Sequence, residues 1–114
     1  MSKEGVVVKE PLCFKETLIG LPARIYMWTR FRFERQGNDV QLFCRSSELP
    51  ESYVTWSRGE ENAQLENGEK YMILNNGDLI IRDISWEDMG IYTCNARNAF
   101  GSDTALAFLY PVKI

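Results

Sequence analysis

The chain has no histidine among its 114 residues. This absence excludes the Ser-His and Cys-His arrangements that activate many enzymatic nucleophiles, and it excludes zinc sites built on histidine. The three cysteines, at positions 13, 44 and 94, lack the close spacing of zinc and thiol-redox motifs. A glycine-rich phosphate-binding loop is also missing. We therefore predict that the chain is not an enzyme and that it binds no cofactor and no metal.

Long apolar runs and strong charge are missing as well. No stretch of 18 apolar residues occurs, so no transmembrane helix and no membrane insertion are expected. The net charge of −3, without a basic stripe, argues against nucleic-acid binding. The first apolar run is too short for a signal peptide, so an extracellular role would make this chain a fragment or a truncated form. No Asn-x-Ser/Thr sequon is present, and no N-linked glycan is predicted to cover any face.

What the sequence does contain is apolar alternation with the period of a β-strand. Residues 24–36 are predicted to form the first strand. This strand is expected to be half-buried, with Phe31 and Phe33 on its inward face and the charged residues between them in water. The second strand, over 40–45, turns alternate apolar residues inward, and Pro111 is predicted to end the last strand. No helical pattern is found. The fold class predicted from these patterns is all-β, with seven or eight strands.

The stretch from Asp88 to Gly101 carries the most specific motif. It resembles the D-x-G-x-Y-x-C-x-A-x-N-x-x-G signature of intermediate-set (I-set) immunoglobulin domains, and a Tyr two residues before a Cys is their tyrosine corner. The resemblance implies an I-set immunoglobulin-like domain, a Greek-key β-sandwich, over residues 24–114. Residues 1–23 are then expected to be a tail or linker, in which Cys13 has no evident partner; a docked edge strand at residues 6–8 is the alternative.

The same resemblance assigns the residues of the core. Trp56 lies 12 positions after Cys44, and Cys94 lies 50 positions after it, which is immunoglobulin spacing. A disulfide between the two cysteines is implied, contributing on the order of 4 kcal/mol at most. The implied core signature consists of Trp56, Leu79, Asp88, Gly90 and Tyr92. Asp88 is expected to accept hydrogen bonds or an arginine at the corner, from Arg82 or Arg45, and its acidic neighbours Asp83 and Glu87 are interpreted as a polar turn rather than a weak calcium site.

A narrower resemblance rests on short strings around this signature. Trp86-Glu87-Asp88-Met89-Gly90, the closing Tyr110-Pro111-Val112 and the early Arg30-Phe31-Arg32-Phe33-Glu34 resemble the C-terminal immunoglobulin domain of small secreted two-domain proteins. These are the insect ecdysone-inducible neural/ectodermal development factor and the nematode Zwei-Ig proteins. The resemblance implies extracellular binding of insulin-like peptides or a role in neuronal development and maintenance.

Alternation also predicts which residues face outward. Phe43, Leu106 and Phe108 fall on outward positions, and Trp86 occupies a site that is usually small or polar. Together these four are the candidate binding surface, since an exposed apolar patch marks an interface. For Trp86 the preferred interpretation is a cap over the bottom of the core.

Three functions remain open at this point. The first is an extracellular protein-binding module, with a protein such as an insulin-like peptide as partner. The second is homophilic adhesion, through another immunoglobulin-domain surface or a weak homodimer. The third is an intracellular structural I-set module of a filament-associated protein, in which the cysteines would be reduced. The redox state of Cys44 and Cys94 separates the first function from the third.

Overall fold

The computed structural model describes residues 5–9, 21–47, 51–59 and 61–113. Its elements in chain order are the strands β1 (Val6–Val8), β2 (Ile25–Thr29), β3 (Phe31–Arg35), β4 (Val40–Leu42), β5 (Cys44–Ser46), β6 (Tyr53–Arg58), β7 (Ala63–Gln64), β8 (Tyr71–Ile73) and β9 (Leu79–Ile81), the 3₁₀ turn η1 (Trp86–Asp88), and the strands β10 (Gly90–Asn98) and β11 (Gly101–Val112). The fold is an all-β immunoglobulin-like sandwich, as predicted.

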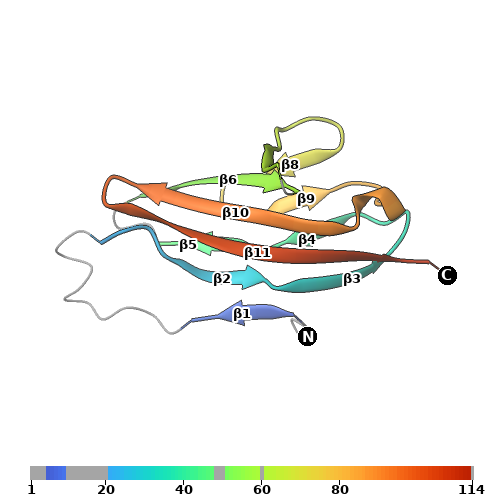
Figure 1. Cartoon of the computed structure of the whole chain (residues 1–114), viewed down its shortest axis with the longest axis horizontal. Coiled ribbons are helices and arrows are strands. Elements are labelled where there is room, and N and C mark those ends of the chain that lie inside the picture. Colours follow the sequence, from blue (N-terminus) through green and yellow to red (C-terminus); the bar gives the residue numbers. More distant parts are fainter. Residues whose placement is uncertain (1–4, 10–20, 48–50, 60, 114) are drawn as a thin grey trace.

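Two layers of strands face each other across the core. One layer is a single sheet in the order β3-β11-β10-β6-β7. The other layer consists of two sheets, β1-β2-β5 and β4-β9-β8. The chain passes from the second of these sheets to the first at Phe43, the single residue between β4 and β5. In Figure 1, β10 and β11 lie in front of β4 and β5, so the view looks onto the outer side of the first sheet.

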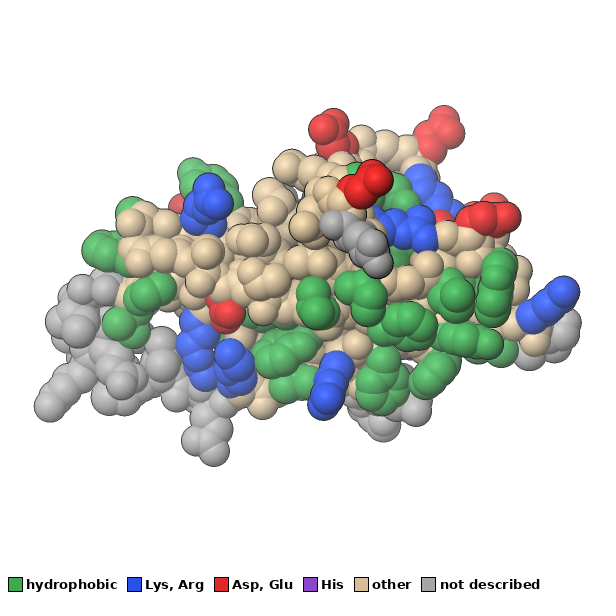
Figure 2. Space-filling model, in the orientation of Figure 1, with side chains coloured by type: hydrophobic (Ala, Val, Ile, Leu, Met, Phe, Trp, Pro, Cys, Tyr) green, Lys and Arg blue, Asp and Glu red, His purple; other side chains and the backbone are tan. Residues whose placement is uncertain are grey.

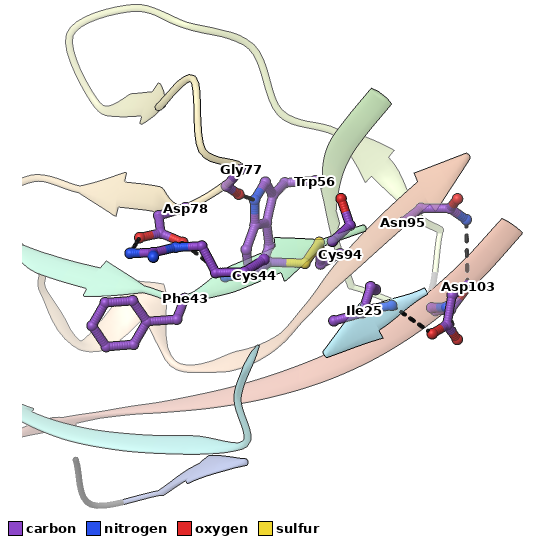
Figure 3. Close-up of a disulfide and its surroundings, with 12 residues drawn as sticks. Ile25, Phe43, Cys44, Trp56, Gly77, Asp78, Cys94, Asn95 and Asp103 are labelled. Carbon is purple, nitrogen blue, oxygen red and sulfur yellow. Dashed lines mark hydrogen bonds and ion pairs between the residues drawn. A yellow bond between two sulfur atoms is a disulfide. The ribbon is translucent and has the colours of Figure 1, made fainter. Parts of the chain in front are cut away.

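The predicted core residues meet between the layers. Cys44 and Cys94 form a disulfide, which confirms the predicted pairing. Beside it the Trp56 side chain is buried, and its indole N–H donates a 2.8 Å hydrogen bond to the Gly77 carbonyl (Figure 3). Leu79 and Tyr92 are also fully buried. The indole nitrogen is thus satisfied inside the core, which is the condition for burying tryptophan at low energetic cost.

The first strand differs from the prediction in both length and facing. Residues 24–36 form two strands, because the chain leaves one layer at Arg30: β2 pairs with β5, whereas β3 pairs in parallel with β11. In β3 the outward residues are Phe31 and Phe33, and the half-buried ones are Arg32 and Glu34, which form an ion pair. The expectation that the two phenylalanines point inward is therefore wrong.

Two further differences lie at the ends of the domain. Val6–Val8 is strand β1, paired antiparallel with β2, so at these residues the chain is an edge strand rather than the expected tail. Cys13 lies outside the described residues. Pro111 does not end the last strand: β11 continues to Val112, paired with β3, while its pairing with β10 stops at Leu109. A proline is tolerated here because the missing N–H falls where no neighbouring strand requires it.

The corner that precedes β10 holds Asp88 through partners other than those expected. Its carboxylate accepts 2.7 Å and 2.8 Å bonds from the Lys70 ammonium and the Ser85 amide, and the Arg58 guanidinium lies 3.9 Å away. Neither Arg82 nor Arg45 reaches it. Arg82 donates to the Glu69 carbonyl and Arg45 pairs with Asp78.

Asp78 is the buried charge that sequence analysis missed. Its side chain is 0% exposed, yet it accepts bonds from the Cys44 amide (2.9 Å), the Gln41 amide nitrogen (2.8 Å) and the Arg45 guanidinium (3.0 and 2.8 Å). Figure 3 shows it beside the disulfide. The bond to Asp78 raises the pKa of Arg45 above its ordinary value, so Arg45 stays a cation at neutral pH.

Tyr92 gives a prediction about alkaline stability. Its hydroxyl donates a 2.7 Å bond to the Asp88 carbonyl, and burial raises the pKa of Tyr92 above its ordinary value. The unfolded chain ionises this group at a pH of about 10, whereas the folded chain keeps it neutral, so its contribution is complete below that pH and is lost above it. We expect Tyr92→Phe to lower the free energy of unfolding by about 1–2 kcal/mol at neutral pH.

Urea titrations from pH 7 to pH 11 measure both effects. The wild type should lose stability above a pH of about 10 more steeply than Tyr92→Phe does, because the variant lacks this proton. If the free energy of unfolding fell equally with pH in the two chains, the buried Tyr92 hydroxyl would not be the cause of the alkaline loss of stability.

Candidate functional site

An apolar surface covers one end of the outer side of the β3-β11-β10 sheet. We call it the aromatic face, and its members are Phe31, Phe33, Trp86, Ile91, Leu106, Phe108 and Tyr110. Phe33 is 54% exposed, Leu106 53% and Trp86 48%. Figure 2 shows apolar side chains gathered over this part of β11 and β3. So many exposed apolar side chains on neighbouring strands are typical of an interaction surface.

Strand register places these residues together. On β11 the alternate residues Ala105, Ala107 and Leu109 are buried, so the residues between them face outward. Phe108 pairs with Ile91 on one side and with Phe31 on the other, and Tyr110 pairs with Phe33. Directly paired residues share a face of the sheet, which makes the aromatic face a consequence of the pairing.

Four rings of this face follow one another in contact. The ring centres of Phe31 and Phe33 are 5.7 Å apart, and those of Phe33 and Tyr110 are 5.9 Å apart. Trp86, in η1, meets Tyr110 edge-on at 5.5 Å and 88°. These distances and tilts are in the favourable range for aromatic pairs, worth about 0.5–1.5 kcal/mol each. The rings are thereby held in place while one side of each remains open to a partner.

The predicted binding residues are only partly brought together. Leu106, Phe108 and Trp86 all lie on the aromatic face. Phe43 lies in the other layer, between β4 and β5, with the Arg45 guanidinium 5.6 Å from its ring centre. Trp86 stands at the surface, where it packs against Tyr110.

Sequence reasoning missed four members of the face: Phe31, Phe33, Ile91 and Tyr110. The alternation of Phe31 and Phe33 was a usable signal, because it placed both on one side of a strand. It could not show which side faces the core, since apolar residues fit either a core face or an interface.

The surroundings of the aromatic face are polar. Further along the same side of β10 and β11 lie Thr93, Asn95 and Thr104, and Tyr53 stands 75% exposed at the far end. Beside Trp86, Glu87 accepts a bond from the Ser85 hydroxyl, which lowers the pKa of Glu87 and keeps it ionised at neutral pH. An apolar centre with a polar rim is the usual anatomy of a protein interface.

Metal binding and membrane crossing find no support in the described parts of the chain. No three metal-binding side chains come together there. Asp88, the most buried carboxylate of the corner, is engaged by Lys70. The described ranges also hold no helix of the length and apolar character needed to cross a membrane.

The fold and the exposed face define an immunoglobulin-type binding module, and comparison with known proteins specifies its family. The immunoglobulin I-set domain family matches residues 32–110. The chain belongs to the I-set family of immunoglobulin domains, whose members are binding modules rather than enzymes.

The similar proteins include those that the short strings predicted. The chain is 49% identical over 87 residues to Zwei Ig domain protein zig-2 of Caenorhabditis elegans, covering 76% of this chain and 35% of that protein. It is 43% identical over 89 residues to the neural/ectodermal development factor IMP-L2 of Drosophila melanogaster, covering 78% and 33%. The chain thus spans about a third of the length of these relatives.

Solved structures agree. The crystal structure of IMP-L2 superposes with a TM-score of 0.76 at 42% identity, over 80% of this chain and 44% of that one. A chain in the crystal structure of the Titin M10-Obscurin like 1 Ig complex superposes with a TM-score of 0.74 at 26% identity, over 83% of this chain and 98% of that one. The narrower resemblance to IMP-L2 and the Zwei-Ig proteins is thereby confirmed, and the I-set fold is shared with titin.

Proposed function

We propose that this chain is the protein-binding immunoglobulin module of an extracellular protein and that it holds its partner on the aromatic face. From the resemblance to IMP-L2 and the Zwei-Ig proteins, the proposed partner is an insulin-like peptide and the proposed setting is neuronal development or maintenance. The observation that carries the proposal is the row of rings from Phe31 to Trp86, which is exposed on a sheet whose other side is core.

Physical chemistry supports this use of the face. Aromatic residues dominate the binding energy of protein interfaces, and they do so best when they are already held in place. The contacts among Phe31, Phe33, Tyr110 and Trp86 supply that order before binding. The face thus loses little conformational entropy when a partner covers it.

The proposal predicts a large loss of binding from a double substitution on the face. Phe33→Ser with Trp86→Ser should weaken binding of an insulin-like peptide at least about 100-fold, because two hot-spot residues each contribute about 2 kcal/mol or more. Isothermal titration of the purified chain with the peptide measures this. The thermal midpoint is recorded alongside and should fall, because the two substitutions remove all three ring contacts. The chain should stay folded, because both side chains are about half exposed and lie outside the buried core.

Tyr53→Ser is the matched control, because Tyr53 is a more exposed aromatic residue at the far end of the same sheet side. It should leave the affinity unchanged. Equal losses in the control and the double variant, or unchanged binding in both, would contradict the proposed site.

A further inference from the structure

A hollow of about 410 Å³ opens beside the aromatic face, between β1 and β2 on one side and β10 and β11 on the other. Its lining includes the side chains of Val7, Trp28, Arg30, Ile91, Leu106 and Phe108. Ile91, Leu106 and Phe108 also belong to the aromatic face, so the hollow is continuous with it. Its volume is sufficient for one large apolar side chain with a polar group attached.

Arg30 is the charged member of this lining. Its backbone N–H donates to the Gly5 carbonyl, but among the described residues its guanidinium has no hydrogen bond and no ion pair. The residue is exposed at the point where the chain passes from β2 to β3. Five donors of a guanidinium therefore stand at the rim of an apolar hollow without a protein acceptor.

The other charges near the hollow balance each other. Lys9 lies 5.4 Å from the Trp28 ring centre and 3.9 Å from the Asp103 carboxylate, which also accepts a bond from the Ile25 amide. None of the lining residues is acidic. Among the residues that the structure describes, nothing compensates the positive charge of Arg30 at the hollow, and the apolar walls beside it strengthen an ion pair by excluding water.

We infer that the hollow receives an apolar side chain of the protein partner together with an adjacent carboxylate, from an acidic side chain or a chain terminus, which pairs with Arg30. This rests on the proposed function, because it specifies the partner that the aromatic face would take. The planar guanidinium fits a carboxylate with two parallel hydrogen bonds. A phosphate fits less well, since phosphopeptide sites gather several cationic residues and the described lining of the hollow contributes Arg30 alone.

Two small probes test the inference without the natural partner. 4-Phenylbutyrate and 4-phenylbutanamide share the phenyl group and the chain, and they differ in the negative charge. Each is titrated into isotopically labelled protein and followed by NMR. The Trp28 indole and the Ile91 and Leu106 methyl groups should shift, and the carboxylate should bind at least about threefold more tightly than the amide.

In the variant Arg30→Gln both probes should still bind, and the ratio of the carboxylate's affinity to the amide's affinity should fall to one. Arg35→Gln is the matched control, because Arg35 is an exposed arginine on β3 that is not part of the lining, and it should keep the wild-type ratio. Equal affinities of the two probes for the wild type would overturn the inference. So would shifts confined to other residues, an unchanged ratio in Arg30→Gln, or no shift with either probe.

The affinity of the variants for an insulin-like peptide tests the carboxylate subsite and the proposed function separately. Arg30→Gln should weaken that binding about tenfold. Full affinity in Arg30→Gln, with binding lost in the Phe33 and Trp86 double variant, would reject the carboxylate subsite and leave the aromatic face as the binding surface. Full affinity in both variants would reject the proposed site itself.

Discussion

Asp78→Ala is expected to lower the free energy of unfolding by about 2–4 kcal/mol, because it removes the fully buried partner of an ion pair whose other member, Arg45, is 31% exposed. The carboxylate is fully buried and accepts bonds from the Cys44 amide, Gln41 and Arg45. Alanine would leave these three donors without their acceptor, and the Arg45 charge would lose its counter-ion. A buried donor that loses its partner forfeits the full energy of desolvation.

Urea unfolding monitored by tryptophan fluorescence measures this loss. Glu66→Ala replaces an exposed carboxylate and should change the stability by no more than about 0.5 kcal/mol. A double-mutant cycle with Arg45→Ala measures the interaction energy between Asp78 and Arg45. A coupling energy near zero would show that the two charges stabilise the sheet independently. A loss no larger than that of Glu66→Ala would contradict the structural role given to Asp78.

Removal of the disulfide is the second large effect. Cys44→Ala with Cys94→Ala should destabilise the chain by about 2–5 kcal/mol, because the bond closes a long loop and removes entropy from the unfolded state. The two cysteines are 50 positions apart and both are buried. Reduction of the wild type by dithiothreitol should have a similar effect, and the same treatment of the double variant should have none.

Thiol titration links this result to the proposed setting. The native chain should present one thiol, that of Cys13, and three after unfolding in reductant. Three thiols in the native protein would fit an intracellular structural module and would contradict the extracellular proposal. Equal stability of the double variant and the oxidised wild type would show that packing alone holds the sheets together.

Much of the core could be predicted, because its signature joins residue types to fixed spacings. A cysteine, a tryptophan and a Tyr-x-Cys at these intervals are hallmarks of an immunoglobulin core, so the sequence alone identifies Cys44, Trp56, Tyr92 and Cys94. Leu79 followed from strand period. The two cysteines, the tryptophan and the tyrosine are predictable because each of these residue types has a defined position in the immunoglobulin core.

The facing of β3 could not be predicted, because period two gives two faces without saying which is buried. Phe31 and Phe33 have the composition of core residues. Their outward position follows from the register of β3 against β11, where Phe31 pairs with Phe108 and Phe33 with Tyr110. That pairing joins segments distant in sequence.

The acidic residues pose the same difficulty. Asp78 follows an Asn-Gly turn and has the sequence signature of an exposed turn residue. Its burial depends on Cys44 and Arg45 approaching from another strand. Asp88 likewise receives Lys70 and Arg58 rather than Arg82 or Arg45, because tertiary packing decides which cation reaches the corner.

The central claim is that the outer side of the β3-β11-β10 sheet binds a protein partner, and methyl NMR of the chain with an insulin-like peptide tests it most directly. Ile91 and Leu106 report on the aromatic face. Ile80, on the outward side of β9 in the other layer, is the internal control. The proposal predicts that the Ile91 and Leu106 signals shift or broaden on addition of peptide while Ile80 stays unchanged. Shifts at Ile80 with Ile91 and Leu106 unchanged, or no shift at any of the three, would contradict it.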